Sequence, residues 1–466
     1  MPYEGELASK SAHSDIIKNP EIQAFLNECS YLTPPSSEEC EKLAAQFSEV
    51  PPTNNVRLPS FAIAVDGSPY EASLDEQLPS TKIGYIKLGA ILIDLEDFAG
   101  LKVGKYVDPF RVAQLQDNNS SFTFFVPSAN IRWGGKQAVR DSFRALVDRQ
   151  FLDEKTRFNR NDPSTSLRTT LFHLASRRAD EKLGTGDPTK LKIHKCPSCG
   201  EGPVTLQDIP EAQFCQNCGE EVYPTDCLRI WEEVSDYQSN QAAINRLMNI
   251  LEHLVPIHYM RYFADQAPVQ LGGIAFFVDG PLAIFGTAAW IHRSIMIYLQ
   301  EINERLKKHN IPPILMIGLQ KSGQVVDHVN FIDRFLPNNR LFAIDDDYRY
   351  KYILAGREAS KNGFGFETYY GQDFIYKTPT GRTFVFGLPY PYDSKSPTGL
   401  DFIKEKVQFK NYLQLPRAIK LIDHFESDLY ENAVIPIALA HHYTAISLEP
   451  GGRVLDLLTK KGLNKS

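Results

Sequence analysis

The chain has 466 residues, of which 42% are hydrophobic and 23% charged. These values match ordinary globular proteins and exclude a disordered, collagen-like or coiled-coil chain, while the length favours two or three structural units over one. The formal net charge is −7. Any contact with a nucleic acid must therefore come from local basic patches, because the overall field repels phosphate.

The N-terminal sequence MPYEGELASK lacks the apolar core of a secretory signal and carries two acids that a transit peptide would avoid. The most apolar stretch, residues 274–291, is interrupted by an Asp-Gly-Pro sequence and a further glycine, which argues against a membrane-spanning helix. Seven cysteines are too sparse for a disulfide scaffold and fit a reducing compartment. We therefore expect a cytoplasmic protein without a membrane span.

The first third of the chain begins with two short helical patterns and a Pro-rich link within residues 1–55, which predict a helical arm. The sequence FAIAVDGS (61–68) predicts an apolar strand that ends in an Asp-Gly turn, and residues 82–98 predict two further strands. Residues 132–178 are helical and basic, with nine Arg and two Lys against five acids. This pattern fits either a solvated helical face or a face that contacts phosphates through side chains such as Arg140 and Arg144.

The second half predicts a mixed fold. A helix is expected over 241–253, and the strands GGIAFFVDG and PILMIGLQ flank a helix over 287–309. Such a βαβ unit has a right-handed crossover, which makes its two strands parallel. Residues 341–390 predict strands and turns, and the C-terminal remainder is mostly helical. We expect an α/β fold with a mixed sheet flanked by helices.

The strongest local signal is the pair of sequences CPSC and CQNC, which contain Cys196, Cys199, Cys215 and Cys218. Two C-x2-C pairs fifteen residues apart have the spacing of a four-thiolate zinc ribbon. Four thiolates leave no open position for water, so the Zn²⁺ is expected to be structural. The expected organisation is an N-terminal arm (1–55), a core domain in two parts (56–190 and 226–455), an inserted ribbon (191–225) and a C-terminal tail (456–466).

Acidic residues follow two of the predicted strands. Asp66 and Asp279 each end an apolar run and precede a glycine, where a cation can approach the backbone closely. An isolated Asp-Gly is also an ordinary turn signal. A third acid would complete a Mg²⁺ or Mn²⁺ site: Glu252 adjoins the apolar face of the 241–253 helix, while Glu233 one segment earlier is its rival.

The order AVDGS, a helix with an internal glutamate, FVDGPLA, IGLQKSG and IALAHHYTAI resembles the NurA family of DNA repair nucleases, in a version that carries an inserted zinc ribbon. The resemblance covers about residues 55–455. It implies an RNase H-like core, a homodimer and a Mn²⁺-dependent nuclease that cleaves single-stranded DNA internally and degrades DNA from 5′ to 3′. It further implies a hexameric HerA-type ATPase as partner, in DNA end resection, double-strand break repair or defence against phage.

Carried over residue by residue, the resemblance assigns catalytic and metal-binding roles to Asp66, Glu252 and Asp279, and catalytic roles to Lys321 at a strand end and His441 of the Ala-His pair. The family's tyrosine before the histidine has no clean match, and Tyr430 lies slightly upstream of its place. The alternative function is a non-catalytic zinc-ribbon adaptor that binds nucleic acid or the ATPase. The chain has no G-x-x-x-x-G-K-[ST] phosphate loop, so movement along DNA would need a separate motor.

Overall fold

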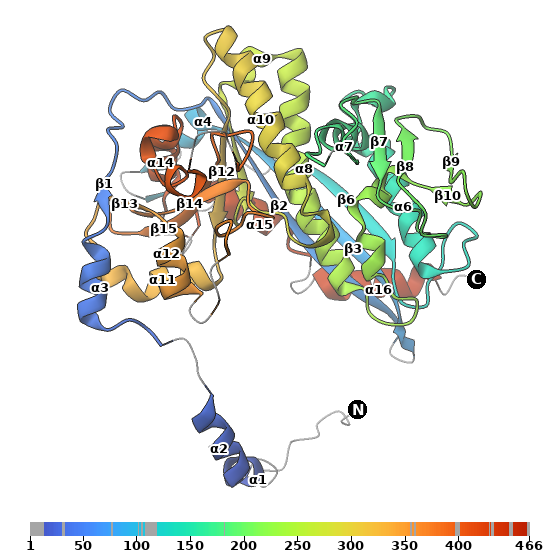
Figure 1. Ribbon diagram of the computed structural model, residues 1–466, viewed down its shortest axis with the longest axis horizontal. Coiled ribbons are helices and arrows are strands. Elements are labelled where there is room, and N and C mark those ends of the chain that lie inside the picture. Colours follow the sequence, from blue (N-terminus) through green and yellow to red (C-terminus); the bar gives the residue numbers. More distant parts are fainter. Residues whose placement is uncertain are drawn as a thin grey trace.

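The computed structural model describes residues 14–29, 33–75, 78–100, 102–103, 106–107, 119–180, 182–354, 357, 360–396, 401–427, 429, 433–446 and 451–463. A nine-stranded mixed sheet runs through the molecule (Figure 1). Its strands, in spatial order, are β1 (Ser48–Glu49), β13 (Arg340–Ala343), β14 (Gly371–Lys377), β15 (Thr383–Pro389), β12 (Leu315–Gln320), β11 (Ile274–Asp279), β2 (Phe61–Asp75), β3 (Leu78–Asp94) and β6 (Asn119–Pro127).

The centre of the sheet has the expected RNase H-like arrangement. β6, β3 and β2 are antiparallel neighbours, and β2, β11 and β12 then run parallel. The crossover between β11 and β12 is α10 (Ile291–Lys308), which confirms the predicted βαβ unit. The expected mixed α/β fold with flanking helices is confirmed.

Two hydrophobic cores lie on opposite faces of the sheet, because side chains alternate along each strand. Ile63 and Val65 of β2 face α8 (Gln241–Gln266), which is longer than the sequence predicted. Ala62 and Ala64 face the core that contains α14 (Leu415–Phe425) and α15 (Ile435–Thr444). Successive side chains of β2 therefore point alternately to the face covered by α8 and to the face covered by α15.

The four-cysteine segment forms two small hairpins, β7 (Lys190–Ile193) with β8 (Val204–Gln207) and β9 (Gln213–Phe214) with β10 (Glu221–Val222). Inward side chains of these hairpins, among them Leu191 and Leu206, belong to the same core as α8. β7 packs on α7 (Leu167–Ser176), which follows α6 (Val139–Leu152). The ribbon is thus anchored to the body of the protein.

The remaining helices and strands are shorter than α6, and the longest of them is α16 with 13 residues. They are α1 (Ser14–Ile17), α2 (Pro20–Glu28), α3 (Ser37–Ala44), α4 (Leu95–Ala99), β4 (Lys102–Val103), β5 (Tyr106–Val107), α9 (Pro268–Leu271), α11 (Gln324–Ile332), α12 (Asp346–Tyr348), α13 (Phe402–Glu405) and α16 (Gly451–Leu463). None of the helices in the described ranges combines the length and the apolar character needed to cross a bilayer.

The sequence predictions were wrong about β2 and β3. β2 does not turn at Asp66 but continues to Asp75, still paired with β3, and residues 82–94 belong to one strand rather than two. Gly67 lets the strand pass close to α8, because a Cβ at this position would lie 2.8 Å from Met248 Cγ of that helix. The glycine therefore marks the close approach of a helix and not a turn.

Two predicted boundaries also differ from the structure. The arm does not extend to residue 55 as a separate piece, because Cys40 and Leu43 of α3 are buried and β1 joins the sheet by pairing with β13. The tail does not begin at residue 456, which lies inside α16. This helix packs on β2, and Tyr70 Oη donates a hydrogen bond to Asp456 Oδ2 at 2.9 Å.

Candidate active site and metal centre

Three of the predicted site residues project from one edge of the parallel strands. The pairing of β11 with β2 ends at Val278 opposite Val65, so Asp66 and Asp279 follow directly where the two strands part. Lys321 is the first residue after β12, which pairs with β11 up to Asp279. By strand alternation all three side chains lie on the α15 face of the sheet. The sequence predicted this convergence, although it misplaced the end of β2.

Asp66 is held by α15. The residue is only 1% exposed, and its Oδ2 lies 3.2 Å from His441 Nδ1. Thr444 Oγ1 donates a hydrogen bond to the same oxygen at 2.7 Å. Thr444 was not predicted from the sequence, but its spacing of three residues from His441 on a helix is a signal that the two side chains share a face.

The ammonium group of Lys321 lies between the two aspartates. Its Nζ is 2.8 Å from Asp279 Oδ2 and 3.9 Å from Asp66 Oδ1. The lysine therefore bridges the carboxylates of adjacent strands and compensates part of their charge.

The third acid comes from the other face of the sheet. Glu252 of α8 is 7% exposed, and its Oε1 accepts a hydrogen bond from Gly67 N at 2.9 Å. Its rival Glu233 instead forms an ion pair with Arg246 at 3.2 Å. Of the two candidates, the structure brings Glu252, and not Glu233, to the aspartates.

The three acids differ in their proton affinity. Burial raises the pKa of Glu252 well above its usual value, and the charges of Asp66 and Asp279 raise it further. Burial also raises the pKa of Asp279 to about 6, with Lys321 opposing the shift. Burial acts in the same sense on Asp66, but hydrogen bonding by His441 and the charge of Lys321 outweigh it and lower that pKa. In the cation-free fold, ionisation is therefore disfavoured at Glu252 and Asp279 and favoured at Asp66.

This donor set fits a hard divalent cation, since Mg²⁺ and Mn²⁺ prefer carboxylate oxygens. Asp66, Glu252 and Asp279 are the residues that would hold it. Among groups of three or more His, Cys, Asp or Glu side chains in the described ranges, only the four cysteines bring all their ligand atoms within 4.8 Å of one another. The carboxylates are more widely spaced, with the Lys321 ammonium between two of them, so cation binding would require this ammonium to move aside.

The four cysteines form a second candidate metal centre. Cys196 Sγ lies 3.8 Å from Cys218 Sγ, and Cys199 Sγ lies 3.8 Å from Cys215 Sγ. The two C-x2-C pairs have the same backbone, in which the glycine after each pair adopts a positive φ and donates its N–H to the carbonyl of the first cysteine. Four thiols within tetrahedral reach of one point fit a zinc ion, as the spacing predicted.

Comparison with known proteins places this arrangement in a family. The amino-acid sequence matches the NurA domain over residues 62–446. The chain belongs to the NurA family. One similar solved structure is the NurA nuclease from Sulfolobus solfataricus, with 8% identity over 98% of this chain and 99% of that chain and a TM-score of 0.34. A NurA structure with manganese has 11% identity over 97% and 98% of the two chains and a TM-score of 0.19. Among curated proteins, no relative matches the chain.

Part of the basic segment of this NurA-family chain is used inside the protein, and the prediction that Arg144 contacts DNA is wrong. Arg144 is 4% exposed, and its guanidinium donates two hydrogen bonds to Asp226, at 2.8 and 2.7 Å. The sequence could not show this partner, which is 82 residues away. Arg140 is partly exposed, and its proposed contact with DNA stays a prediction.

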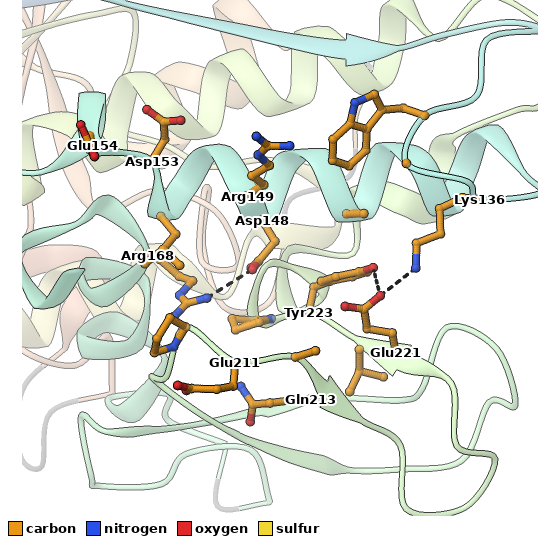
Figure 2. A pocket seen from close by; sticks show the side chains of 18 of the residues that line it. Lys136, Asp148, Arg149, Asp153, Glu154, Arg168, Glu211, Gln213, Glu221 and Tyr223 are labelled. Atoms are coloured by element: carbon orange, nitrogen blue, oxygen red, sulfur yellow. Dashed lines mark hydrogen bonds and ion pairs between the residues drawn. The ribbon is translucent and has the colours of Figure 1, made fainter.

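Other charges of this segment line a cavity of about 700 Å³ between α6 and the ribbon. Figure 2 shows Arg168 directed at Asp148, and Lys136 and Tyr223 meeting at Glu221. Arg168 also pairs with Asp208 of the ribbon at 3.3 Å, so part of the arginine bias of the sequence reflects internal ion pairs. Tyr430, the nearest counterpart of the family's tyrosine, lies outside the described residues.

The raised pKa of Asp279 predicts that this residue destabilises the cation-free NurA fold. The pKa is higher in the folded state than the usual value of 3.8, so stability is lost as the pH rises from about 4 to about 6. The full penalty, about 3 kcal/mol, applies at pH 7.5. In buffer free of Mn²⁺ and Mg²⁺, with the zinc site loaded, Asp279→Asn should therefore melt several degrees above the wild type at pH 7.5 and close to it at pH 4. A lower melting temperature of the variant at pH 7.5 would contradict this electrostatic account.

Proposed function

We propose that this protein is a cytoplasmic, metal-dependent DNA nuclease of the NurA type. It would hydrolyse phosphodiester bonds with Mn²⁺ or Mg²⁺, as a single-strand endonuclease and a 5′ to 3′ exonuclease. The single observation that carries the proposal is the meeting of Asp66, Asp279 and Glu252 around Lys321 in a chain of the NurA family. A zinc ion in the four-cysteine cluster would stabilise the fold.

A divalent cation bound by the three acids would activate water and neutralise charge on the phosphate. The protein's own groups would do the rest. His441 is positioned by Asp66 through Nδ1, and the ring is half-exposed. If Nδ1 carries the proton of the neutral ring, Nε2 is the nitrogen that can take a proton from water and return one to the leaving oxygen. Asp66 would then both orient this base and stabilise its charged form.

Lys321 would act on the substrate. Its ammonium already lies beside two carboxylates, and its side chain is 24% exposed. If the acids bound a cation, the flexible lysine stem would let the ammonium turn toward the phosphate and pair with a non-bridging oxygen. The same residue would thus compensate the acids without the cation and bind the substrate with it.

The proposed setting is DNA end processing, in double-strand break repair or defence against phage, with a homodimer mounted on a HerA-like hexameric ATPase. The absence of a phosphate-loop motif from the sequence supports a separate motor. The family membership supports the rest of this setting.

The function is tested by cleavage of an end-labelled and an internally labelled single-stranded oligonucleotide with Mn²⁺. Glu252→Gln should lower the cleavage rate by at least about a hundredfold, since loss of one group that stabilises a transition state has this size of effect. Glu233→Gln tests the rival acid: glutamine keeps an oxygen that can accept the hydrogen bond from Arg246 Nε, so this variant should cleave at close to the wild-type rate.

If the wild type leaves both oligonucleotides intact, alone and with a HerA-like ATPase, the nuclease proposal fails and the zinc-ribbon adaptor takes its place. If instead Glu233→Gln is inactive and Glu252→Gln is active, the assignment of the third acid is wrong.

A further inference from the structure

An exposed aromatic ring lies on the loop that leaves the candidate active site. Phe285 comes six residues after Asp279 and is 45% exposed. The residues before it, Leu282, Ala283 and Ile284, are all buried. The chain therefore turns one aromatic residue outward directly after a buried run.

This ring is held rigidly. Ala283 forms a β-bridge with Tyr369, and Ile284 N donates a hydrogen bond to Thr368 O at 2.9 Å. The Tyr369 ring meets the Phe285 ring edge-on, with centroids 6.0 Å apart. Tyr369 is itself 8% exposed. Phe285 thus rests on a buried aromatic ring, and a ligand that stacks on it would not have to order the loop first.

The cationic side chain of Arg246 packs against the next residue, Gly286. A Cβ at Gly286 would fall 2.5 Å from Arg246 Cζ, so the guanidinium lies against the loop backbone in the space that a side chain would fill. Glu233 fixes this guanidinium by accepting a hydrogen bond from Nε at 3.2 Å. The terminal amino groups of Arg246, which is 28% exposed, are then the donors that a phosphate would meet.

Helix α8 carries both Arg246 and Glu252, and so sets the position of Arg246 relative to the acids. Arg246 precedes Glu252 by six residues on one helix, which is about 9 Å along the helix axis. Phe285 is tied to Asp279 by a short loop. An aromatic residue whose loop neighbour, Gly286, contacts a cationic side chain has the composition of a single-stranded nucleic-acid site, in which a base stacks and the adjoining phosphate pairs with the cation.

We propose that Phe285 and Arg246 form a nucleotide-binding subsite, in which Phe285 stacks on a base near the cleaved phosphodiester of single-stranded DNA and Arg246 binds its phosphate. The inference rests on the proposed function for its substrate class. Stacking of this kind tolerates any base, because every base has a π-face. The subsite would therefore position the strand without imposing a sequence.

Binding is measured without cleavage, in buffer free of Mn²⁺ and Mg²⁺, by the fluorescence anisotropy of a labelled twelve-nucleotide oligothymidylate. Phe285→Ala should weaken binding about tenfold. The plot of affinity against salt should keep its slope, because the lost contact is not ionic. Arg246→Gln should lower this slope by about 0.7, the value for one phosphate contact on a single strand. Phe331→Ala, at a phenylalanine of α11 that is 39% exposed, is the matched control and should bind like the wild type.

A strand of the same length without bases separates stacking from a change in fold. The wild type should bind the oligothymidylate about tenfold more tightly than this abasic strand, and Phe285→Ala should bind both alike. Phe285→Trp should restore the preference and show quenched indole fluorescence on binding. Equal preference for the base-containing strand in the wild type and in Phe285→Ala would overturn the inference.

The failures of the two proposals are distinguishable. A base preference that depends on Phe285, in a protein that leaves DNA intact with Mn²⁺ and the ATPase, would refute the nuclease and keep the subsite. Cleavage that depends on Glu252, without a base preference that depends on Phe285, would refute the subsite alone.

Discussion

Asp66→Asn should lower Mn²⁺-dependent cleavage of single-stranded DNA by at least about a thousandfold. Asp66 is the acid with the most contacts in the candidate site: His441 and Thr444 meet one of its oxygens, and Lys321 is nearest the other. Asparagine keeps the shape but removes the charge that orients His441 and that would hold the cation. The loss of two functions at one residue is expected to exceed the hundredfold to thousandfold effect of a single stabilising group.

Asp327→Asn is the matched control for this substitution, because Asp327 is exposed in the first turn of α11 and lies outside the acid cluster. It should retain the wild-type cleavage rate. Zinc content and thermal melting should show that both variants are folded. A folded Asp66→Asn protein that keeps more than about a tenth of the activity would contradict the assignment.

Asp66→Asn and Asp279→Asn should change the melting temperature in opposite directions. The pKa of Asp66 is lowered in the fold, so its ionised form contributes stability above the usual pKa of 3.8, and this contribution is lost as the pH falls through the folded value. Asp66→Asn should therefore melt below the wild type at pH 7.5 in the absence of divalent cations, whereas Asp279→Asn melts above it. Two acids on neighbouring strands thus have opposite effects on the cation-free fold.

Cys196→Ser should abolish stoichiometric zinc binding and lower the free energy of unfolding by at least about 3 kcal/mol, a modest share of the energy that structural zinc supplies to small domains. Cys196 is 1% exposed and belongs to the same hydrophobic core as the ribbon residues Leu191 and Leu206 and as α8. Loss of the metal would therefore loosen the packing beneath the ribbon as well as the ribbon itself. Metal analysis of the purified protein and its thermal melting measure the two effects.

Cys29→Ser is the control, because Cys29 is exposed and lies outside the cluster. It should retain zinc and the wild-type melting temperature. Limited proteolysis should cut Cys196→Ser within residues 191–225 before any other part of the chain. Wild-type zinc content in Cys196→Ser would show that the cluster is not the metal site.

The sequence predicted those parts of the site that depend on local spacing. The cysteine pairs and the paired Asp-Gly sequences are of this kind, as is the βαβ unit that brings Lys321 beside Asp279. The choice between Glu252 and Glu233 was left open, because both lie in segments that precede β11 and only burial distinguishes them.

The errors arose where a distant partner determines the role of a residue. Gly67 suggested a turn because the helix that approaches it is 181 residues further along the chain at Met248. Arg144 suggested a contact with DNA because its partner Asp226 comes from the segment after the ribbon. Pairing across such separations leaves no periodic signal in the sequence, so only the folded structure shows it.

The acids of the site approach from opposite faces of the sheet. Asp66 is positioned by α15, whereas Glu252 is carried by α8, and the two helices belong to different hydrophobic cores. A chain in which only one of these cores has formed holds an incomplete set of acids. If the proposed function holds, an enzyme that cuts DNA would therefore be harmless while it is being synthesised and folded, since its cutting centre exists only after both layers have closed on the sheet.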